Sequence, residues 1–145
     1  MRIISANVNG IRSAYKKGFH EYLAASGADI VCVQELKAQE ADLDDSMKAP
    51  HDMHGVWHCA EKRGYSGVAL YSKREPDRVQ TGMGIAEFDA EGRFVQADFG
   101  NLSVISLYLP SALTFYYQYE SAGFTIHINL LMLILFLNAI GRYRN

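Results

Sequence analysis

The segment ADIVCVQEL, residues 28–36, decides the fold, because it is a nearly continuous apolar run that ends in a carboxylate. A run of this kind predicts a strand buried on both faces, with helices or a second sheet covering it. Upstream, the β-branched segment RIISANV, residues 2–8, predicts another strand. Between them, residues 14–26 have apolar side chains at helical spacing, with Ser13 as N-cap and Gly27 as C-terminal stop. Such a strand–helix–strand unit predicts two parallel strands.

The chain downstream of this unit is rich in short strands. Residues 37–54 are polar and predict a loop that contains a short helix at residues 40–48. Further strands, separated by turns that contain glycine, are predicted at residues 55–61, 67–73, 78–85, 93–100 and 102–109. The predicted fold class is therefore α/β (α+β), with a mixed sheet rich in hairpins.

Composition narrows the classes of protein to which the chain can belong. The 145 residues are 49% hydrophobic, which is typical of a globular domain and argues against a disordered chain. The net charge of -2 does not by itself indicate a nucleic-acid partner. The two cysteines, Cys32 and Cys59, suggest no disulfide framework, and the N-terminus lacks the pattern of a signal peptide. These features predict a cytoplasmic location.

Three polar side chains, those of Asn7, Glu35 and Tyr108, follow predicted strands where each strand ends. Strand ends often carry function, because the sheet fixes a side chain there and leaves it reachable. A carboxylate at Glu35 would suit Mg²⁺, and Asn7 could orient the same site. The residues alone leave alternatives open: a solvated or ion-paired Glu35, an Asn7 that caps a turn, and a Tyr108 at the rim of a sheet.

The segment KRGYSG, residues 62–67, combines two cations, a flexible turn and an aromatic ring. This combination predicts a contact to a phosphate backbone. The alternative is that the basic pair Lys62 and Arg63 forms a solvated face, as such pairs usually do.

Four ordered segments, SANVNGIRS, VCVQELKAQ, KRGYSGVALYSK and SLYLPS, resemble the N-terminal part of the exodeoxyribonuclease III / AP endonuclease family, within the endonuclease/exonuclease/phosphatase superfamily. The resemblance covers residues 1–111. It implies an α/β sandwich of two sheets, with the second sheet largely missing from this chain. It also implies an Mg²⁺-dependent nuclease, with Mn²⁺ as the alternative metal. Its substrate would be double-stranded DNA with abasic sites or 3′ ends, and no protein partner is implied.

The resemblance also assigns roles to individual residues. Asn7 and Glu35 would belong to the metal site, with Glu35 as the ligand. Tyr108 would be catalytic, orienting or polarising the phosphate under attack. The residues that would contact DNA are Tyr65, Arg63 and Asn9.

Residues 112–145 differ in character from residues 1–111. They hold only three charged side chains, Glu120, Arg142 and Arg144, and they contain no Asp. The Gly-Asp-Trp-Asn, Asp-Tyr and Ser-Asp-His motifs that the family carries further along are absent from this sequence. We therefore divide the chain into the N-terminal part of a nuclease domain and an unrelated apolar tail, and we expect the truncated chain to have little or no activity.

The tail has three possible explanations: an out-of-frame continuation, which the simultaneous change in composition and motifs favours, a membrane-associated helix through residues 124–140, or a helix packed on the sheet. Its uninterrupted apolar run, residues 130–137, is shorter than the roughly 20 residues that a spanning helix needs. Two other functions also stay open. One is a phosphodiesterase of the same superfamily that acts on small phosphate esters, and the other is a non-catalytic, membrane-associated fragment.

Overall fold

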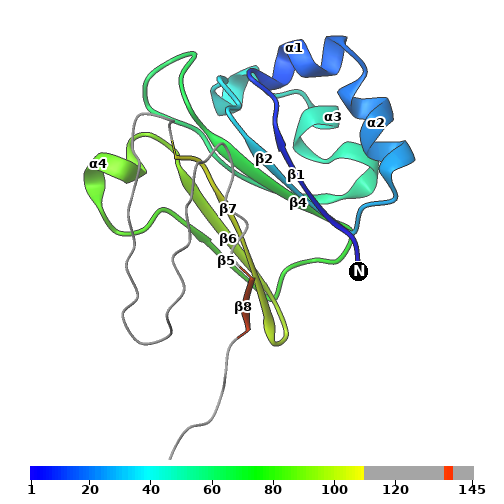
Figure 1. Cartoon of the computed structure of the whole chain (residues 1–145). Helices are drawn as coiled ribbons and strands as arrows, with labels where there is room; N and C mark the ends of the chain where they lie inside the picture. The colour runs from blue at the N-terminus through cyan, green and yellow to red at the C-terminus, as the bar shows by residue number, and fades with distance from the viewer. Residues whose placement is uncertain (110–135, 139–145) are drawn as a thin grey trace, which may run out of the picture.

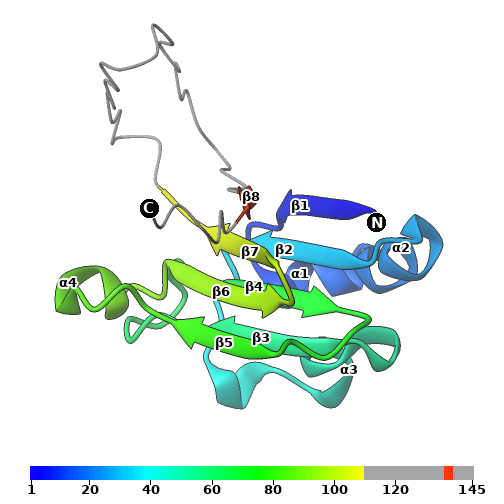
Figure 2. The same ribbon diagram turned by 90° about the horizontal axis from the view of Figure 1, so that it is seen from below.

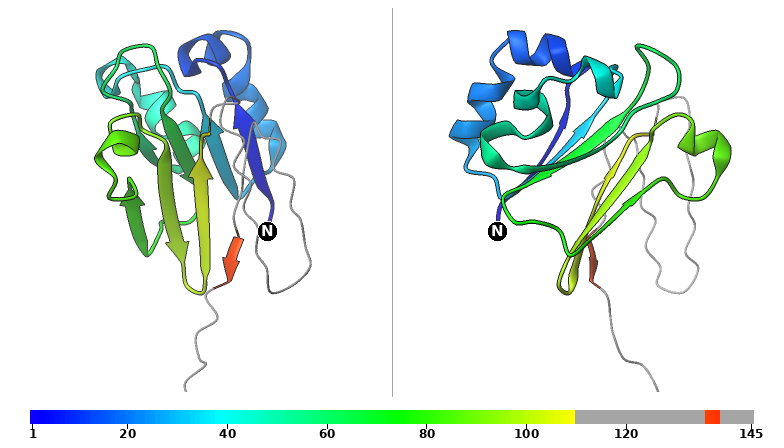
Figure 3. Two further views of the ribbon diagram at one scale, coloured as in Figure 1. Left: turned by 60° about the vertical axis from the view of Figure 1, so that its left-hand side comes forward. Right: turned by 180° about the vertical axis from the view of Figure 1, so that it is seen from behind.

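Two four-stranded sheets pack face to face in a computed structural model of the chain, which describes residues 1–109 and 136–138. The helices α1, α2 and α3 cover the outer face of the first sheet, and the second sheet lies on its other face (Figure 1, and Figure 3, right). The predicted α/β sandwich of two sheets is confirmed.

The first sheet contains the strand–helix–strand unit. Its strands run in the order β1 (Ile3–Asn7), β2 (Ile30–Gln34), β4 (Val68–Ser72) and β3 (His54–His58). β1 and β2 are parallel, as predicted, and the other neighbours are antiparallel. Every residue of β2 is buried, which confirms that its apolar run is covered on both faces.

The second sheet is more complete than the sequence predicted. It contains β5 (Arg78–Thr81), β6 (Phe94–Phe99), β7 (Leu102–Leu107) and β8 (Phe136–Asn138), in that order and all antiparallel (Figure 2). We expected most of this sheet to be missing. Residues 78–107 nevertheless supply three adjacent strands by themselves: residues 100–101 form a tight turn between β6 and β7, and residues 82–93, which include α4, return the chain so that β6 pairs with β5.

The predicted tail, residues 112–145, lies outside the described residues except for β8. The alternative of a membrane-associated helix through residues 124–140 therefore falls largely outside them as well. Within residues 1–109 and 136–138, no helix has the length and apolar character needed to cross a membrane.

The helix predicted at residues 14–26 is in fact two helices, α1 (Ile11–Lys16) and α2 (Phe19–Ser26). Gly18 separates them with a left-handed backbone, φ 91°, which a continuous right-handed helix does not accommodate. Ser13 lies inside α1 and is not its N-cap. The short helical segments elsewhere are η1 (Glu40–Asp42), α3 (Asp45–Lys48), η2 (Pro50–Asp52) and α4 (Ala86–Asp89).

The apolar core has two parts, one on each face of the first sheet. Between this sheet and the helices lie residues such as Ile11, Leu23 and Val31. Between the two sheets lie Cys32, Leu70, Val95 and their neighbours, all shielded from solvent.

The sheets are also joined by buried polar groups. Gln34 on β2 is fully buried, and its Nε2 donates to the hydroxyl oxygens of Ser5 at 3.2 Å and Ser106 at 3.3 Å. Ser106 belongs to β7 and donates in turn to the carbonyl of Val33 at 3.3 Å. These bonds connect the end of β2 to the end of β7.

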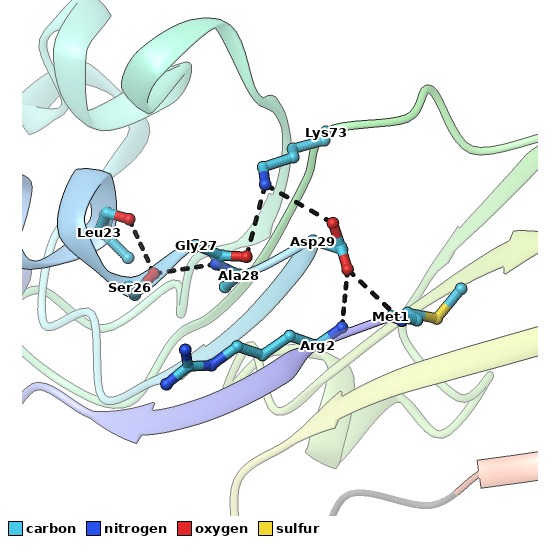
Figure 4. Close-up of polar contacts among 8 residues, drawn as sticks. All are labelled: Met1, Arg2, Leu23, Ser26, Gly27, Ala28, Asp29 and Lys73. Atoms are coloured by element: carbon cyan, nitrogen blue, oxygen red, sulfur yellow. Dashed lines mark hydrogen bonds and ion pairs between the residues drawn. The ribbon is translucent and has the colours of Figure 1, made fainter.

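Asp29 fixes the start of β1 against the start of β2 (Figure 4). Its Oδ2 accepts a hydrogen bond from the backbone nitrogen of Arg2 at 2.7 Å and faces the amino terminus of Met1 at 3.9 Å. Its Oδ1 pairs with Nζ of Lys73 at 3.6 Å. These contacts agree with the register of the parallel pair, which places Asn7 opposite Gln34 at the far end.

Candidate active site

The ends of three strands bring three polar side chains together. Because β1 and β2 are parallel and Asn7 is opposite Gln34, Glu35 follows directly beside Asn7. Tyr108 follows β7, which packs against β2 from the other sheet. The structure thus places Asn7, Glu35 and Tyr108 in one cluster, while their roles in catalysis stay predictions.

Three donors converge on the carboxylate of Glu35. Nδ2 of Asn7 donates to Oε1 at 2.8 Å, and Nζ of Lys37 forms an ion pair with Oε2 at 2.9 Å. The hydroxyl of Tyr108 also forms a hydrogen bond with this carboxylate. The Glu35 side chain remains 15% exposed, so the site is shielded but open to solvent.

The backbone around Glu35 adopts a conformation that residues other than glycine rarely take. Glu35 has φ 57° and Lys37 has φ 47°, both left-handed. The glycine-containing turn after residue 63 holds this loop through two backbone hydrogen bonds. The nitrogen of Leu36 donates to the carbonyl of Gly67 at 3.1 Å, and the nitrogen of Lys37 donates to the carbonyl of Ser66 at 2.9 Å. Unusual backbone conformations of this kind cluster at functional sites and persist only where neighbouring structure enforces them.

Burial and hydrogen bonding together set the protonation states of Glu35 and Tyr108. Burial alone would raise the pKa of Glu35, but hydrogen bonds from Asn7, Lys37 and Tyr108 outweigh it and hold the pKa below its ordinary value. Burial, together with the hydrogen bond and charge of Glu35, raises the pKa of Tyr108 to about 12. Near neutral pH, Glu35 is therefore a carboxylate and Tyr108 is a protonated hydrogen-bond donor.

The predicted DNA contacts lie around this cluster. The backbone nitrogen of Asn9 donates to Oδ1 of Asn7 at 3.0 Å, and its side-chain oxygen accepts from Lys37. Tyr65 is half-buried in the turn before β4. Arg63 is exposed in the same turn, and no hydrogen bond or ion pair to another residue in 1–109 fixes it.

Two features of the site were missed by sequence reasoning. One is Arg93, a buried arginine whose Nη2 donates to the hydroxyl of Tyr65 at 3.0 Å and whose Nη1 donates to the carbonyl of Tyr108 at 3.3 Å. The sequence offered no signal for it, because a single Arg before a strand normally reads as a solvated cation.

The other missed feature is a basic cavity of about 520 Å³ beside Glu35. Lys37, which forms the ion pair with Glu35, also lines this cavity, so the cavity and the Glu35 cluster are neighbours. The spacing of cations along NGIRSAYKK was the available signal. The cavity is lined by Asn9, Gly10, Arg12, Ser13, Lys16, Lys37 and Met47.

The donors at Glu35 suit a hard cation. A carboxylate oxygen is a ligand type that Mg²⁺ accepts, and Mg²⁺ often takes only one or two carboxylates together with waters and substrate phosphates. Asn7 presents its Nδ2 to Glu35, while its Oδ1 accepts from the backbone nitrogen of Asn9, so the carboxylate is the ligand that this cluster offers. A cation at Oε2 would compete with the ammonium of Lys37, which lies at 2.9 Å. No group of three or more His, Cys, Asp or Glu side chains in the described part of the chain could hold a metal ion. The chemistry of the donors thus fits a site of the open, water-rich kind.

Comparison with known proteins gives a consistent result. A family model described as "Endonuclease/Exonuclease/phosphatase family" matches residues 4–136. The chain is 43% identical over 113 residues to an exodeoxyribonuclease of Bacillus subtilis, a match that covers 77% of this chain and 44% of that protein. It is 40% identical to the DNA repair nuclease APEX1 of Danio rerio, covering 77% of this chain and 37% of the relative.

Solved structures show the same likeness. A 3′-5′ exonuclease from Neisseria meningitidis superposes with a TM-score of 0.65 at 27% identity, covering 77% of this chain and 42% of that one. The catalytic domain of APE2 from Xenopus laevis superposes with a TM-score of 0.64 at 29% identity, and the match covers 76% of this chain and 45% of that one. Another similar structure, a Neisseria 3′ phosphatase, is described as bound to a product DNA hairpin. The match covers less than half the length of each of these relatives.

Proposed function

The chain belongs to the endonuclease/exonuclease/phosphatase family, and on that premise we propose that it carries the first part of the active site of a divalent-metal-dependent DNA-repair nuclease. One observation carries the proposal. The carboxylate of Glu35 stands at the end of a buried strand, held by Asn7, Lys37 and Tyr108, beside a cavity lined by cations.

Each member of the cluster has a chemical role in this proposal. Glu35 is the ligand for Mg²⁺, with Mn²⁺ as the alternative, and the hydrogen bond from Asn7 fixes the direction of the carboxylate. When bound, the metal would supply positive charge that stabilises a phosphate under attack. Tyr108 stays protonated at neutral pH, since its pKa is raised to about 12, and it can donate a hydrogen bond to a phosphate oxygen.

The surrounding residues are suited to hold a polynucleotide. Tyr65, Arg63 and Asn9 would contact the DNA backbone, and the cations of the basic cavity would neutralise adjacent phosphates. Such contacts fix the register of a protein on DNA without reading its sequence. We propose double-stranded DNA with abasic sites or 3′ ends as the substrate, supported by the DNA-repair activities for which the similar proteins are named.

We also propose that this chain alone cleaves DNA slowly. A positioned general base contributes about 10²–10⁴-fold, and one electrostatic donor about 10²–10³-fold. Catalytic groups act as a unit, so the loss of several leaves activity near background. The support is that the sequence lacks the Asp-bearing motifs that its family resemblance leads one to expect beyond residue 111.

Binding and cleavage of a labelled duplex with one abasic-site analogue test the proposal on the purified 145-residue chain. We expect Mg²⁺ to strengthen binding relative to EDTA, and we expect Glu35→Gln to abolish that gain. Glu75→Gln is the matched control, because Glu75 is an exposed carboxylate after β4 and the change in charge is identical. Cleavage is expected near background.

Two results would contradict the proposal. The metal role fails if binding is the same in Mg²⁺ and EDTA, or if Glu35→Gln and Glu75→Gln behave alike. Rapid hydrolysis of bis(p-nitrophenyl) phosphate that DNA does not inhibit would instead favour a phosphodiesterase for small esters.

A further inference from the structure

Arg93 occupies an unusual position between two aromatic rings. This residue, directly before β6, is only 4% exposed, yet it carries a full positive charge. Its Cζ lies 5.8 Å from the centroid of the Tyr65 ring and 5.4 Å from the centroid of the Tyr108 ring. The guanidinium therefore contacts both the tyrosine that we assign to DNA binding and the tyrosine that we assign to the phosphate.

The hydrogen bonds of Arg93 are directed inward. Nη2 donates to the hydroxyl of Tyr65 at 3.0 Å, Nη1 donates to the carbonyl of Tyr108 at 3.3 Å, and Nε donates to the carboxylate of Glu91. The hydroxyl of Tyr65 donates in turn to Glu91 at 3.5 Å, which closes a ring of polar contacts. A guanidinium committed on all three nitrogens and shielded from solvent is poorly placed to bind a phosphate itself.

The backbone strengthens this link. The nitrogen of Tyr108 donates to the carbonyl of Arg93 at 3.0 Å, so the two residues are bonded through both main chain and side chain. Gly92, just before Arg93, is so close to the end of β3 that an added Cβ would lie 2.5 Å from the carbonyl oxygen of His58. The position of Arg93 is therefore fixed by both sheets.

We propose that Arg93 is a positioning residue that locks Tyr65 and Tyr108 into one unit, so that a DNA contact at Tyr65 is transmitted to the tyrosine beside Glu35. This inference rests on the proposed function for the meaning of the two tyrosines, and its geometry stands independently. Arginine suits the task better than lysine, because its planar group stacks on a ring while donating in fixed directions.

The test uses the full chain with ring-¹³C-labelled tyrosine, and the signals of Tyr65 and Tyr108 are assigned from their Tyr→Phe variants. Arg93→Lys keeps the charge beside Glu91 and removes the planar fork. We expect it to shift both tyrosine signals. We also expect Tyr65→Phe to shift the Tyr108 signal in the parent chain, and to shift it at least several-fold less in the Arg93→Lys background.

Arg74→Lys is the matched control, because Arg74 also pairs with a carboxylate, that of Asp77 at 2.7 Å, but is exposed. It is expected to move neither signal. Should Arg93→Lys not fold, the pair Arg93→Gln with Glu91→Gln removes both charges and gives the same readout.

The proposal is overturned if the Tyr108 signal is unchanged by loss of Arg93, or if the effect of Tyr65→Phe persists undiminished without it. A purely structural arginine would not make one tyrosine's signal depend on the other's hydroxyl. The experiment contains neither DNA nor metal, so its outcome tests the coupling through Arg93 independently of the proposed nuclease function.

Discussion

Asn7 and Glu35, 28 residues apart in the sequence, are joined by one hydrogen bond of 2.8 Å between Nδ2 and Oε1. The parallel pairing of β1 and β2 creates this contact, since it sets both strand ends at the same edge of the sheet. The bond directs one oxygen of the carboxylate and leaves its other oxygen to Lys37. The register of β1 and β2 thereby sets the orientation of the Glu35 carboxylate.

Removing the Asn7 amide is expected to raise the pKa of Glu35 toward its ordinary value, because a hydrogen bond that lowers it is lost. A depressed folded-state pKa stabilises the fold above the unfolded value, about 4.3, and this contribution is lost as pH falls through the folded value. The stability that Glu35 contributes, and that is lost as pH falls, should therefore be smaller in Asn7→Ala than in the parent chain. Carboxyl ¹³C NMR titration measures the pKa of Glu35, and Asn101→Ala, at an exposed asparagine, is the control. An unchanged Glu35 titration would contradict the role of Asn7.

Tyr108→Phe keeps the ring and removes the hydroxyl that bonds to Glu35. The free energy of unfolding should fall by only about 0.5–1.5 kcal/mol, the usual net value of one hydrogen bond. Catalysis is measured in a chimera whose residues 1–109 replace the matching part of the Bacillus subtilis exodeoxyribonuclease. There the variant should cleave about 10²–10³-fold more slowly. Tyr22→Phe, at a side chain 49% exposed, should leave both measurements unchanged. Cleavage by the Tyr108→Phe chimera at the parent rate would show that Tyr108 is not part of the catalytic site.

Gly67→Ala should destabilise the chain more than Gly64→Ala, although both glycines lie in the same turn with positive φ. Each substitution costs about 1–2 kcal/mol from the left-handed backbone alone. Only at Gly67 does the added Cβ approach the Cβ of Leu36, at 3.1 Å, next to Glu35, and this overpacking should add about 1–3 kcal/mol. Urea unfolding of both variants gives the difference. Equal losses of stability would show that the turn does not press on the Glu35 loop.

Ser106→Ala should cost about 1–3 kcal/mol of unfolding free energy, because it leaves a buried donor of Gln34 without its partner on β7. Ser103→Ala, on the same strand but only partly buried, should cost less than about 0.5 kcal/mol. Thermal or urea unfolding compares the two. If they are equally mild, the polar contact between the sheets contributes nothing to their alignment.

Lys16→Gln should weaken binding of duplex DNA by neutralising one cation of the basic cavity. The dependence of log K on log[salt] should become shallower by about 0.9 if one phosphate contact is lost. Fluorescence anisotropy between low and moderate salt measures both quantities. Lys73→Gln is the control, because Lys73 pairs with Asp29 at the opposite end of β2. An identical salt slope for the two variants would exclude the cavity from DNA binding.

Local pattern was sufficient to predict much of the fold. The apolar run at residues 28–36 lacks the alternation of a half-exposed strand, and it predicted the fully buried β2. The strand–helix–strand order predicted the parallel pairing of β2 with β1. Pattern failed at Gly18, because apolar spacing continues through a residue whose backbone breaks the helix. It also underestimated the second sheet, whose pairing depends on contacts that no single segment encodes.

The candidate site divides in the same way. Asn7, Glu35 and Tyr108 could be found because strand ends and short motifs are visible in sequence. Arg93 could not, since its importance comes from burial between two tyrosines that are 43 residues apart along the chain, Tyr65 and Tyr108. The cytoplasmic location and the nature of residues 112–145 stay predictions.

The most direct test of the account is the rate at which the chimera cleaves an abasic-site duplex in Mg²⁺, measured for Glu35→Gln against Glu75→Gln. The metal ligand should be worth several kcal/mol of barrier, so Glu35→Gln should slow cleavage by on the order of 10²-fold or more while Glu75→Gln cleaves at the parent rate. Cleavage by a folded Glu35→Gln chimera at the parent rate would contradict the claim that this carboxylate forms part of a phosphodiester-hydrolysing site.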